Sequence, residues 1–291
     1  MVTSSFEYFA PSSIDEATSL LSRYKDDARI LAGGHSLVPI MKLRLSSPKY
    51  LIDIGRIDGL ANISLDGDIL YVGAMATYRD IEESDLVRIH APMLAEAASQ
   101  VADPQVRNKG TIGGSLAHAD PAGDFPAVVL ALGASVVACT RRATRSINIE
   151  RFFVGMLTTR LRPTEIITGV TIPSQRSGSG SAYVKFANKA SHYPIAGIAA
   201  LLQLDSSGLV SNARIAVAGV GQKASRATRT ERILRGKEPT VSVIRRASDR
   251  AGIELDGELT DDVHASASYR KHLAKVCCER AITAAVLNAG S

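Results

Sequence analysis

The sequence predicts an α+β protein of two domains, and its length, one interior segment and the order of its patterns support that prediction. With 291 residues the chain is long enough for two modest domains with sizeable cores. The stretch PSQRSGSGS, from Pro173 to Ser181, has the composition of a linker. Strand patterns and then helical patterns follow it, the order of an α+β domain with an antiparallel sheet. We therefore expect domains over residues 1–176 and 177–291.

The first domain is predicted to begin with a helix and to continue with short strands. Ser13 to Glu16 have a capping-box pattern, and apolar residues at helical spacing extend the helix to Tyr24. The LDGD sequence at 65–68 predicts a turn before the next strand. The other patterned segments of this part are strands over 28–34, 49–55 and 68–75 and a helix over 91–102.

Further strands complete the first domain and form the second. In the first domain they are predicted over 135–139, 145–149 and 164–173. In the second, three successive strands over 182–188, 194–205 and 213–220 predict the antiparallel sheet. The last helical pattern of the chain includes Leu273, Cys277 and Ala284, and we expect it to pack on that sheet.

The composition excludes several classes of function. The net charge of +5 is scattered and aromatic residues are few, so no nucleic-acid surface is predicted. The charge fits a solvated surface or a docking face for an acidic partner. The three cysteines form no C-x-x-C pair, which excludes a disulfide framework, an iron–sulfur cluster and a cysteine zinc site. Without a signal-peptide pattern or a membrane-length apolar run, the protein is expected in the cytoplasm with free thiols.

Two diglycine loops carry the most specific chemical signal. Gly33-Gly34 and Gly113-Gly114 are each followed by a serine and then by an apolar segment. Glycine allows a ligand to approach the backbone closely, and successive N–H groups that point one way form an anion-binding nest. One such loop alone is more often a simple connection between a strand and a helix. Two nests can hold the two phosphates of a pyrophosphate, so the repetition favours a dinucleotide.

The sequence also contains one match to the G-x-G-x-x-G/A dinucleotide fingerprint, from Gly219 to Ala224. It follows the strand predicted over 213–220. However, the acidic residue at suitable spacing, Glu238, precedes the next apolar run instead of ending it. We therefore interpret this match as a strand end that packs over a helix.

The two glycine motifs, AGGHSLVPIMKLRL and TIGGSLAHADPAGDFP, together resemble the FAD-binding medium subunit of molybdenum hydroxylases of the carbon monoxide dehydrogenase and xanthine dehydrogenase type. The resemblance extends from FEYFAPSSIDEATSLL through EIITGVTIP to the C-terminal domain, nearly the whole chain. It implies a two-part FAD-binding domain of the vanillyl-alcohol-oxidase/p-cresol-methylhydroxylase fold. A smaller α+β domain of the carbon monoxide dehydrogenase flavoprotein type, with a three-stranded antiparallel sheet and helices, would follow it.

The resemblance implies cofactor contacts for particular residues. In the family, two loops wrap the FAD pyrophosphate with backbone N–H groups. The matching residues here are Ala32, Gly33, Gly34, His35 and Ser36 in the first loop and Thr111, Ile112, Gly113, Gly114 and Ser115 in the second. Asp124 matches an acid that hydrogen-bonds the ribityl chain. Leu161 and Lys185 match residues at the pyrimidine edge of the flavin, and Tyr193 matches a side chain over its ring face.

Three of the polar loop residues have alternative roles. In some relatives with the broad fold, a histidine near the first loop bonds covalently to the flavin, whereas the medium subunits hold FAD non-covalently. We expect the non-covalent form for His35. His118 and Asp120 are either proton-transfer groups or polar groups satisfied within their loop. No residue is expected to act as a catalytic acid or base or as a metal ligand.

The resemblance also implies partner chains. A molybdenum hydroxylase needs a molybdenum cofactor and [2Fe–2S] clusters, and this chain lacks the cysteines that would ligate clusters. Those groups are expected on a large molybdenum-binding subunit and a small [2Fe–2S] subunit, in a dimer of heterotrimers. The chain would pass electrons from the clusters through FAD to an external acceptor, which is NAD, a quinone, oxygen or a carrier protein.

The sequence leaves two other functions open. One is a stand-alone FAD-dependent oxidoreductase of the same fold that acts directly on a small molecule. The other is a non-enzymatic module in which the glycine loops are structural turns. Co-purification with two partner chains would exclude the first, and a flavin absorbance spectrum would exclude the second.

Overall fold

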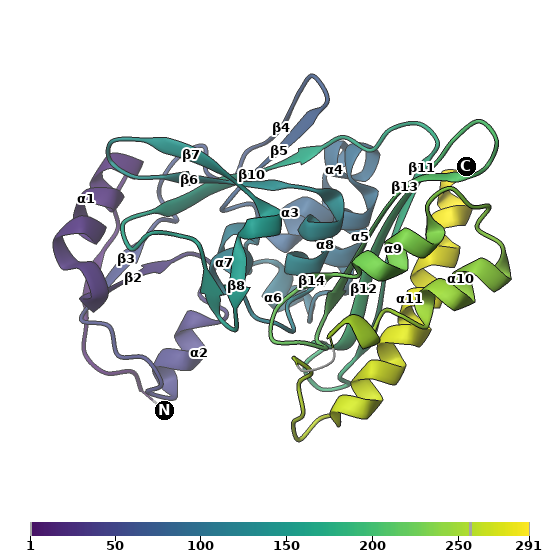
Figure 1. Ribbon diagram of the computed structural model, residues 1–291. Helices are drawn as coiled ribbons and strands as arrows, with labels where there is room; N and C mark the ends of the chain where they lie inside the picture. The colour runs from purple at the N-terminus through teal and green to yellow at the C-terminus, as the bar shows by residue number, and fades with distance from the viewer. Residues whose placement is uncertain (1, 256–257, 291) are drawn as a thin grey trace.

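The computed structural model describes residues 2–255 and 258–290. The sheets follow one another along the molecule, and helices lie between them (Figure 1). The N-terminal sheet has the order β1-β3-β2 with parallel pairing. Its elements are β1 (Glu7–Phe9), α1 (Ile14–Tyr24), η1 (Lys25–Asp27), β2 (Ala28–Leu31), α2 (Leu37–Lys42) and β3 (Tyr50–Asp53). The predicted first helix is confirmed: Ser13 Oγ accepts the Glu16 N–H, and the Glu16 carboxylate accepts the N–H of Ser12.

A five-stranded antiparallel sheet with the order β4-β5-β10-β6-β7 follows. Its strands are β4 (Ile63–Asp66), β5 (Ile69–Gly73), β6 (Ser135–Cys139), β7 (Thr144–Asn148) and β10 (Ile166–Pro173). The LDGD sequence forms the predicted turn, in which Gly67 takes a positive φ of 54°. The small elements η2 (Ile149–Arg151), β8 (Phe153–Gly155) and β9 (Thr158–Thr159) lie between β7 and β10.

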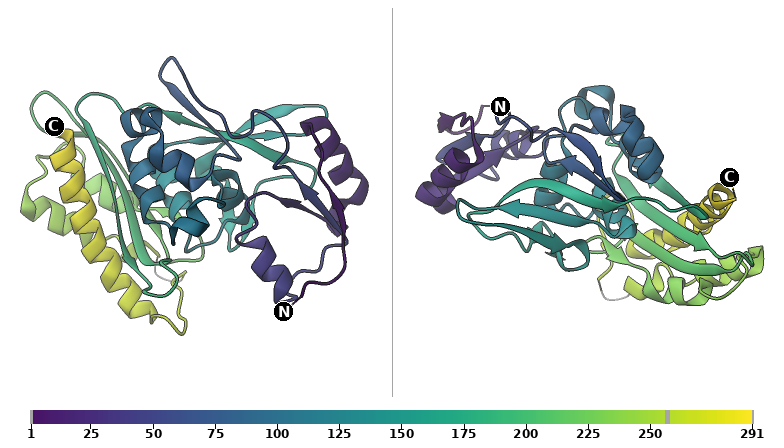
Figure 2. Two further views of the ribbon diagram at one scale, coloured as in Figure 1. Left: turned by 180° about the vertical axis from the view of Figure 1, so that it is seen from behind. Right: turned by 90° about the horizontal axis from the view of Figure 1, so that it is seen from above.

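The helices of this region lie between the five-stranded sheet and the C-terminal sheet (Figure 2). They are α3 (Tyr78–Glu83), α4 (Asp85–His90), α5 (Pro92–Gln100), α6 (Pro104–Arg107), α7 (Ile112–His118) and α8 (Asp124–Leu132). Every residue of α8 is buried, and after Asp124 at its start the helix is apolar on all sides. Its central position makes it part of a core that also includes Tyr183 and Ala199 of the C-terminal sheet.

The C-terminal sheet is antiparallel and has the order β11-β12-β13-β14. The three predicted strands are β11 (Ser179–Ala187), β12 (Pro194–Leu204) and β13 (Val210–Ala218), and the two-residue strand β14 (Ser225–Arg226) adds a short edge. The long helix α11 (Ala267–Ala289) packs on β11 and β12, opposite α8. The remaining helices are α9 (Thr228–Leu234), α10 (Val241–Ser248) and η3 (Ile253–Leu255).

Two sequence interpretations are refined by the structure. The segment predicted as a linker is an anchored turn, because Pro173 ends β10, Ser179 begins β11, and the Gln175 side chain bonds both Ser179 O and Ser181 Oγ. The Gly219–Ala224 match is a strand end without a following helix. Gly219 has a φ of 76° and donates its N–H to Pro121 O. The Gly219–Ala224 segment therefore lacks the helix N-terminus at which the dinucleotide fingerprint places a diphosphate.

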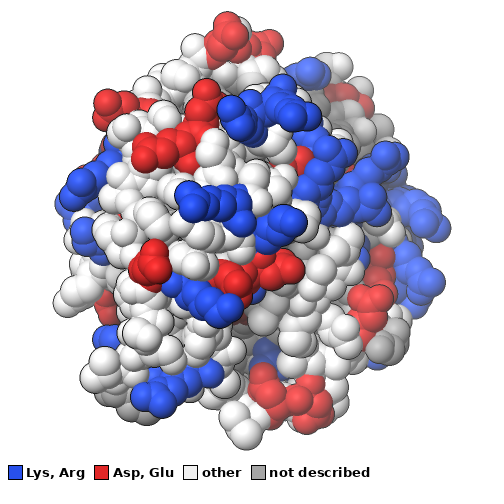
Figure 3. Space-filling model, turned by 90° about the vertical axis from the view of Figure 1, so that its left-hand side faces the viewer, with Lys and Arg blue, Asp and Glu red and all other residues white. Residues whose placement is uncertain are grey.

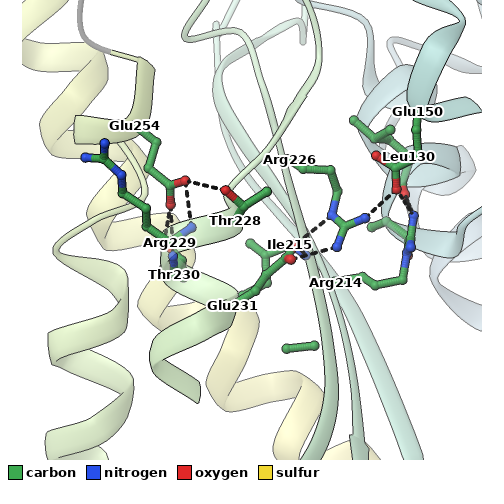
Figure 4. A network of polar contacts seen from close by, with 12 residues as sticks. Leu130, Glu150, Arg214, Ile215, Arg226, Thr228, Arg229, Thr230, Glu231 and Glu254 are labelled. Carbon is green, nitrogen blue, oxygen red and sulfur yellow. Dashed lines mark hydrogen bonds and ion pairs between the residues drawn. The ribbon is translucent and has the colours of Figure 1, made fainter. Parts of the chain in front are cut away.

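An ion network joins the far end of α8 to the C-terminal sheet (Figure 4). Arg214 of β13 donates to Leu130 O at 2.8 Å and to Glu150 at 2.6 Å. Arg226 pairs with both Glu150 and Glu231. Arg214 thus adds side-chain donors to the carbonyl groups of Leu130 and Ala131 at the α8 C-terminus.

Charges of both signs are mixed on the surface (Figure 3), and the thiols are not paired with one another. Figure 3 shows Lys and Arg interspersed with Asp and Glu on one face, with a larger group of Lys and Arg toward one edge. The three cysteines Cys139, Cys277 and Cys278 are free. Across the described residues, no helix has both the length and the apolar character needed to cross a bilayer.

Candidate functional site

The first diglycine loop, residues 32–36, connects β2 to α2 and packs against the segment before the second loop. A Cβ on Gly33 would lie 1.8 Å from the carbonyl oxygen of Lys109, so only glycine fits there. Gly34 has a φ of 74°, which also favours glycine. The His35 Nδ1 lies 2.9 Å from Gly33 O and holds the imidazole over the loop. The glycines therefore serve the packing of the two loops as well as access to the backbone.

The backbone N–H groups of the first loop are available for a ligand. Within residues 2–255 and 258–290, no acceptor takes the N–H groups of residues 33–37, whereas the next one, Val38, donates to Gly34 O. The Ser36 side chain forms no cap to α2. Such a run of N–H groups at a turn entering a helix suits an anion such as a diphosphate.

The second diglycine loop uses its N–H groups within the protein. Ile112 N donates to Ala76 O, Gly113 N to Ala74 O, and Gly114 N to Thr111 Oγ1 at 3.1 Å. A Cβ on Gly113 would lie 2.6 Å from the Ala74 Cβ. We expected both loops to present backbone N–H groups. In the structure these N–H groups are engaged, so the second loop contributes side chains and a packed wall.

A cavity of about 300 Å³ lies between the two loops, α8 and the loop that follows β11. The predicted residues on its surface are His35, Ser36, Ser115, Asp124 and Tyr193. The other predicted loop residues, Ala32, Gly33, Gly34, Thr111, Ile112, Gly113 and Gly114, lie in the two loops but are not among the lining residues. Leu161 is half-buried against the main core and Lys185 is nearly buried, and neither lines the cavity.

Several lining residues were missed by the sequence interpretation. Tyr78, at the start of α3, packs its ring against Phe125 with centroids 4.9 Å apart, and burial raises its pKa. The segment after α5 also lines the cavity through Val101 and Ala102. His118 and Asp120, which we expected to be either proton-transfer groups or polar groups satisfied within their loop, both lie on the cavity surface. Asp120 Oδ1 accepts the Ala122 N–H within that loop. No sequence motif marks Tyr78 or the segment after α5.

Asp124 is a buried carboxyl group on the cavity wall. It begins α8 and is 6% exposed. Its Oδ1 accepts hydrogen bonds from Tyr183 OH at 2.8 Å and from the Lys185 ammonium at 2.9 Å. Burial raises the pKa of Asp124, while the Lys185 charge and the two hydrogen bonds act against that rise. The site thus places a buried, partnered carboxyl group at a helix N-terminus on the cavity wall.

Among the described residues, no group of three or more His, Cys, Asp or Glu side chains is arranged to hold a metal ion. The residues that fit FAD are those of the first loop and the cavity. The N–H groups of the loop have no acceptor within the described chain, and tyrosine and serine side chains line the cavity next to the loop. A diphosphate needs such donors, and a flavin ring needs aromatic and apolar walls.

We expect Thr111→Val to lower the free energy of unfolding by about 1 kcal/mol, because the Thr111 hydroxyl caps α7 by accepting the Gly114 N–H. Thr283→Val is the matched control. The Thr283 hydroxyl bonds only the Glu279 carbonyl on the exposed face of α11, and its loss should change stability little. Urea denaturation of both variants measures the difference. Equal effects would contradict the capping role.

Two family models match the chain. The FAD-binding domain of molybdopterin dehydrogenases matches residues 4–175, and the carbon monoxide dehydrogenase flavoprotein C-terminal domain matches residues 181–285. The medium chain of carbon monoxide dehydrogenase from Hydrogenophaga pseudoflava is 39% identical over 285 residues, 98% of each chain. The 6-hydroxypseudooxynicotine dehydrogenase complex subunit alpha from Paenarthrobacter nicotinovorans is 39% identical over 282 residues, 97% of this chain and 95% of its own.

Solved structures give the same assignment. Carbon monoxide dehydrogenase from Hydrogenophaga pseudoflava, in a form that lacks the Mo-pyranopterin moiety, superposes with a TM-score of 0.96 at 40% identity and 99% coverage of both chains. Quinoline 2-oxidoreductase from Pseudomonas putida 86 superposes with a TM-score of 0.93 at 34% identity, over the full length of both chains. These matches and the geometry of the first loop lead to one conclusion. The chain belongs to the family of FAD-binding medium subunits of molybdenum-containing hydroxylases and dehydrogenases, a family of oxidoreductases.

Proposed function

We propose that this chain holds FAD non-covalently and serves as the electron-transfer subunit of a molybdenum hydroxylase. One observation carries the binding mode: the N–H groups of residues 33–37 have no acceptor within the described chain, and two residues of this run, His35 and Ser36, line the cavity. These donors would bind the diphosphate. When bound, FAD supplies the exchange of one or two electrons, which no side chain of the cavity offers.

The remaining predicted residues divide into those that touch the cofactor and those that support it. Ser115 and Asp124 line the cavity and would hydrogen-bond the phosphate and ribityl region. Tyr193 is 43% exposed at the rim and would cover the ring face, excluding water. Leu161 would lie near the pyrimidine edge. Lys185 would lie near the same edge and act on it through its positive charge, because its three N–H donors are already used within the chain.

We further propose that the chain works in the cytoplasm with a large molybdenum-binding subunit and a small [2Fe–2S] subunit, in a dimer of heterotrimers. Its own cysteines are free, so clusters would have to be held elsewhere. Two relatives support such an assembly by name, one as a complex subunit and one as a medium chain. The acceptor would be NAD, a quinone, oxygen or a carrier protein. Within the chain, we place the domain boundary at residues 176 and 177, inside the turn between β10 and β11.

Purification from the native source tests this function. We expect two further chains to co-purify, and the preparation to show a flavin absorbance spectrum. Acid precipitation should release the flavin into the supernatant as FAD, whereas flavin that stays with the precipitated protein would indicate a covalent bond to His35. A single yellow chain that oxidises a small molecule would favour the stand-alone oxidoreductase. A colourless preparation that gains no thermal protection from added FAD would refute the proposed function.

A further inference from the structure

Lys185 lies behind the cavity and contacts three segments of its wall. The ammonium donates to Asp124 Oδ1 at 2.9 Å, to Gln100 O at 2.8 Å and to His192 O at 2.8 Å. An ammonium has three N–H donors, so each one is used. The Lys185 side chain is 4% exposed and does not itself line the cavity.

Each acceptor belongs to a segment that forms the cavity surface. Asp124 begins α8 and lines the cavity directly. Gln100 ends α5, and the two residues after it line the cavity. His192 precedes Tyr193, and both are lining residues. One buried cation therefore fixes the relative positions of three wall segments that are distant in the sequence.

Two of these segments have a strained backbone next to the contact. Ala102 has a φ of 42° and His192 has a φ of 61°, a left-handed conformation that L side chains disfavour. Residues in this conformation persist when surrounding contacts hold them. The bond from Lys185 to the His192 carbonyl supplies such a contact directly.

The loop of residues 188–193 has few other ties. Inside the loop, Asn188 N donates to Tyr193 O, His192 N donates to Asn188 O, and Asn188 Oδ1 accepts two further N–H groups. Within the described chain, two side-chain hydrogen bonds connect it to its surroundings: the one from Lys185 to His192 O, and an exposed one of 3.3 Å between Asn188 and His264. The hydrogen bond from Lys185 is charged and shorter than the one to His264, so it is the stronger of the two.

We propose that Lys185 is a positioning residue that holds the 188–193 loop, and with it Tyr193, against the cavity, with Asp124 as the counter-charge. This role depends only on contacts within the chain and applies whether or not FAD is bound. It differs from a direct contact of Lys185 with the flavin. Loss of the ammonium should free the loop while the rest of the fold stays closed.

Limited trypsin digestion of the full chain without FAD tests the proposal, because exposed Lys189 lies inside the loop. We expect Lys185→Met to speed cleavage after Lys189 by about ten-fold, the effect of losing one charge-assisted hydrogen bond on local opening. Cleavage at the exposed turn residues Arg141 and Arg142 is the internal reference and should keep its wild-type rate. Lys275→Met, which removes a lysine from an exposed ion pair, is the control variant and should change neither rate.

Two further variants separate positioning from general stability. The double variant Asp124→Asn/Lys185→Met leaves no unpaired buried charge, so it should fold even where Lys185→Met does not, and it should show the same selective cleavage. Lys185→Arg keeps the cation and should lower the cleavage ratio relative to Lys185→Met. An unchanged ratio in Lys185→Met and the double variant, or equal acceleration at Arg141 and Lys189, would overturn the proposal. Since no step uses FAD, failure here leaves the proposed function untouched.

Discussion

Glu231→Ala is expected to lower the free energy of unfolding by about 3 kcal/mol, the effect of breaking a buried ion pair by removing one partner. The Glu231 side chain is 3% exposed and pairs with Arg226 and Arg235. It also accepts the N–H of Ile215 at 2.8 Å. Alanine would leave Arg226, whose side chain is 11% exposed, with Glu150 alone, and the Ile215 N–H without an acceptor (Figure 4).

The matched control is Glu279→Ala. Glu279 pairs with Arg245 on the surface, where the arginine side chain is 68% exposed, and such pairs contribute little. Urea denaturation curves of both variants against wild type measure the difference. If the two variants lost similar stability, the network between β13, β14 and α9 would not be a major tie of the C-terminal sheet.

Gly33→Val is expected to abolish FAD binding and to lower the free energy of unfolding by about 3 kcal/mol, at the upper end of what overpacking costs. The new Cβ would lie 1.8 Å from the Lys109 carbonyl oxygen and 3.1 Å from the Gly110 Cα, and both are backbone atoms that cannot turn away. The loop would have to move, and with it the N–H groups of residues 33–37. Thermal unfolding with and without FAD, together with the flavin content of the purified chain, measures both effects.

Gly155→Ala is the control for this prediction. Gly155 has open space around its Cβ position, so the substitution should keep both the stability and the flavin of the wild type. Retention of FAD by Gly33→Val would contradict the assignment of the first loop to the diphosphate. A loss of FAD in Gly155→Ala would show that flavin content is too sensitive a measure of local change.

The elements were predictable where a single local signal determines them. The cap of α1, the turn at Gly67 and the strands β11 to β13 each follow from spacing and turn chemistry within a few residues. The conformation of the segment after β10 was not predictable. Its serines and glycines suggest flexibility, whereas the Gln175 side chain forms hydrogen bonds to Ser179 and Ser181. A side chain that bonds across a turn leaves no trace in composition.

The sequence predicted that the two glycine loops act together, and the structure places residues of both loops on one cavity. Both glycine loops border the cavity, yet the sequence could not tell that Gly33 and Gly113 make room for Lys109 and Ala74. It also could not place Tyr78 in the wall. These facts depend on which backbone segments meet in space, and only long-range pairing in the folded chain determines that.

Because α8 is apolar on every side after Asp124, and β12 and β13 cover it, the order of synthesis has a consequence. When the first 176 residues have left the ribosome, this helix still lacks the strands that will enclose it. The nascent chain then exposes the apolar helix α8 until roughly forty more residues have emerged. Those residues include both β12 and β13. Chaperone binding and aggregation during production should therefore concentrate in that interval, and truncation within it should yield insoluble protein.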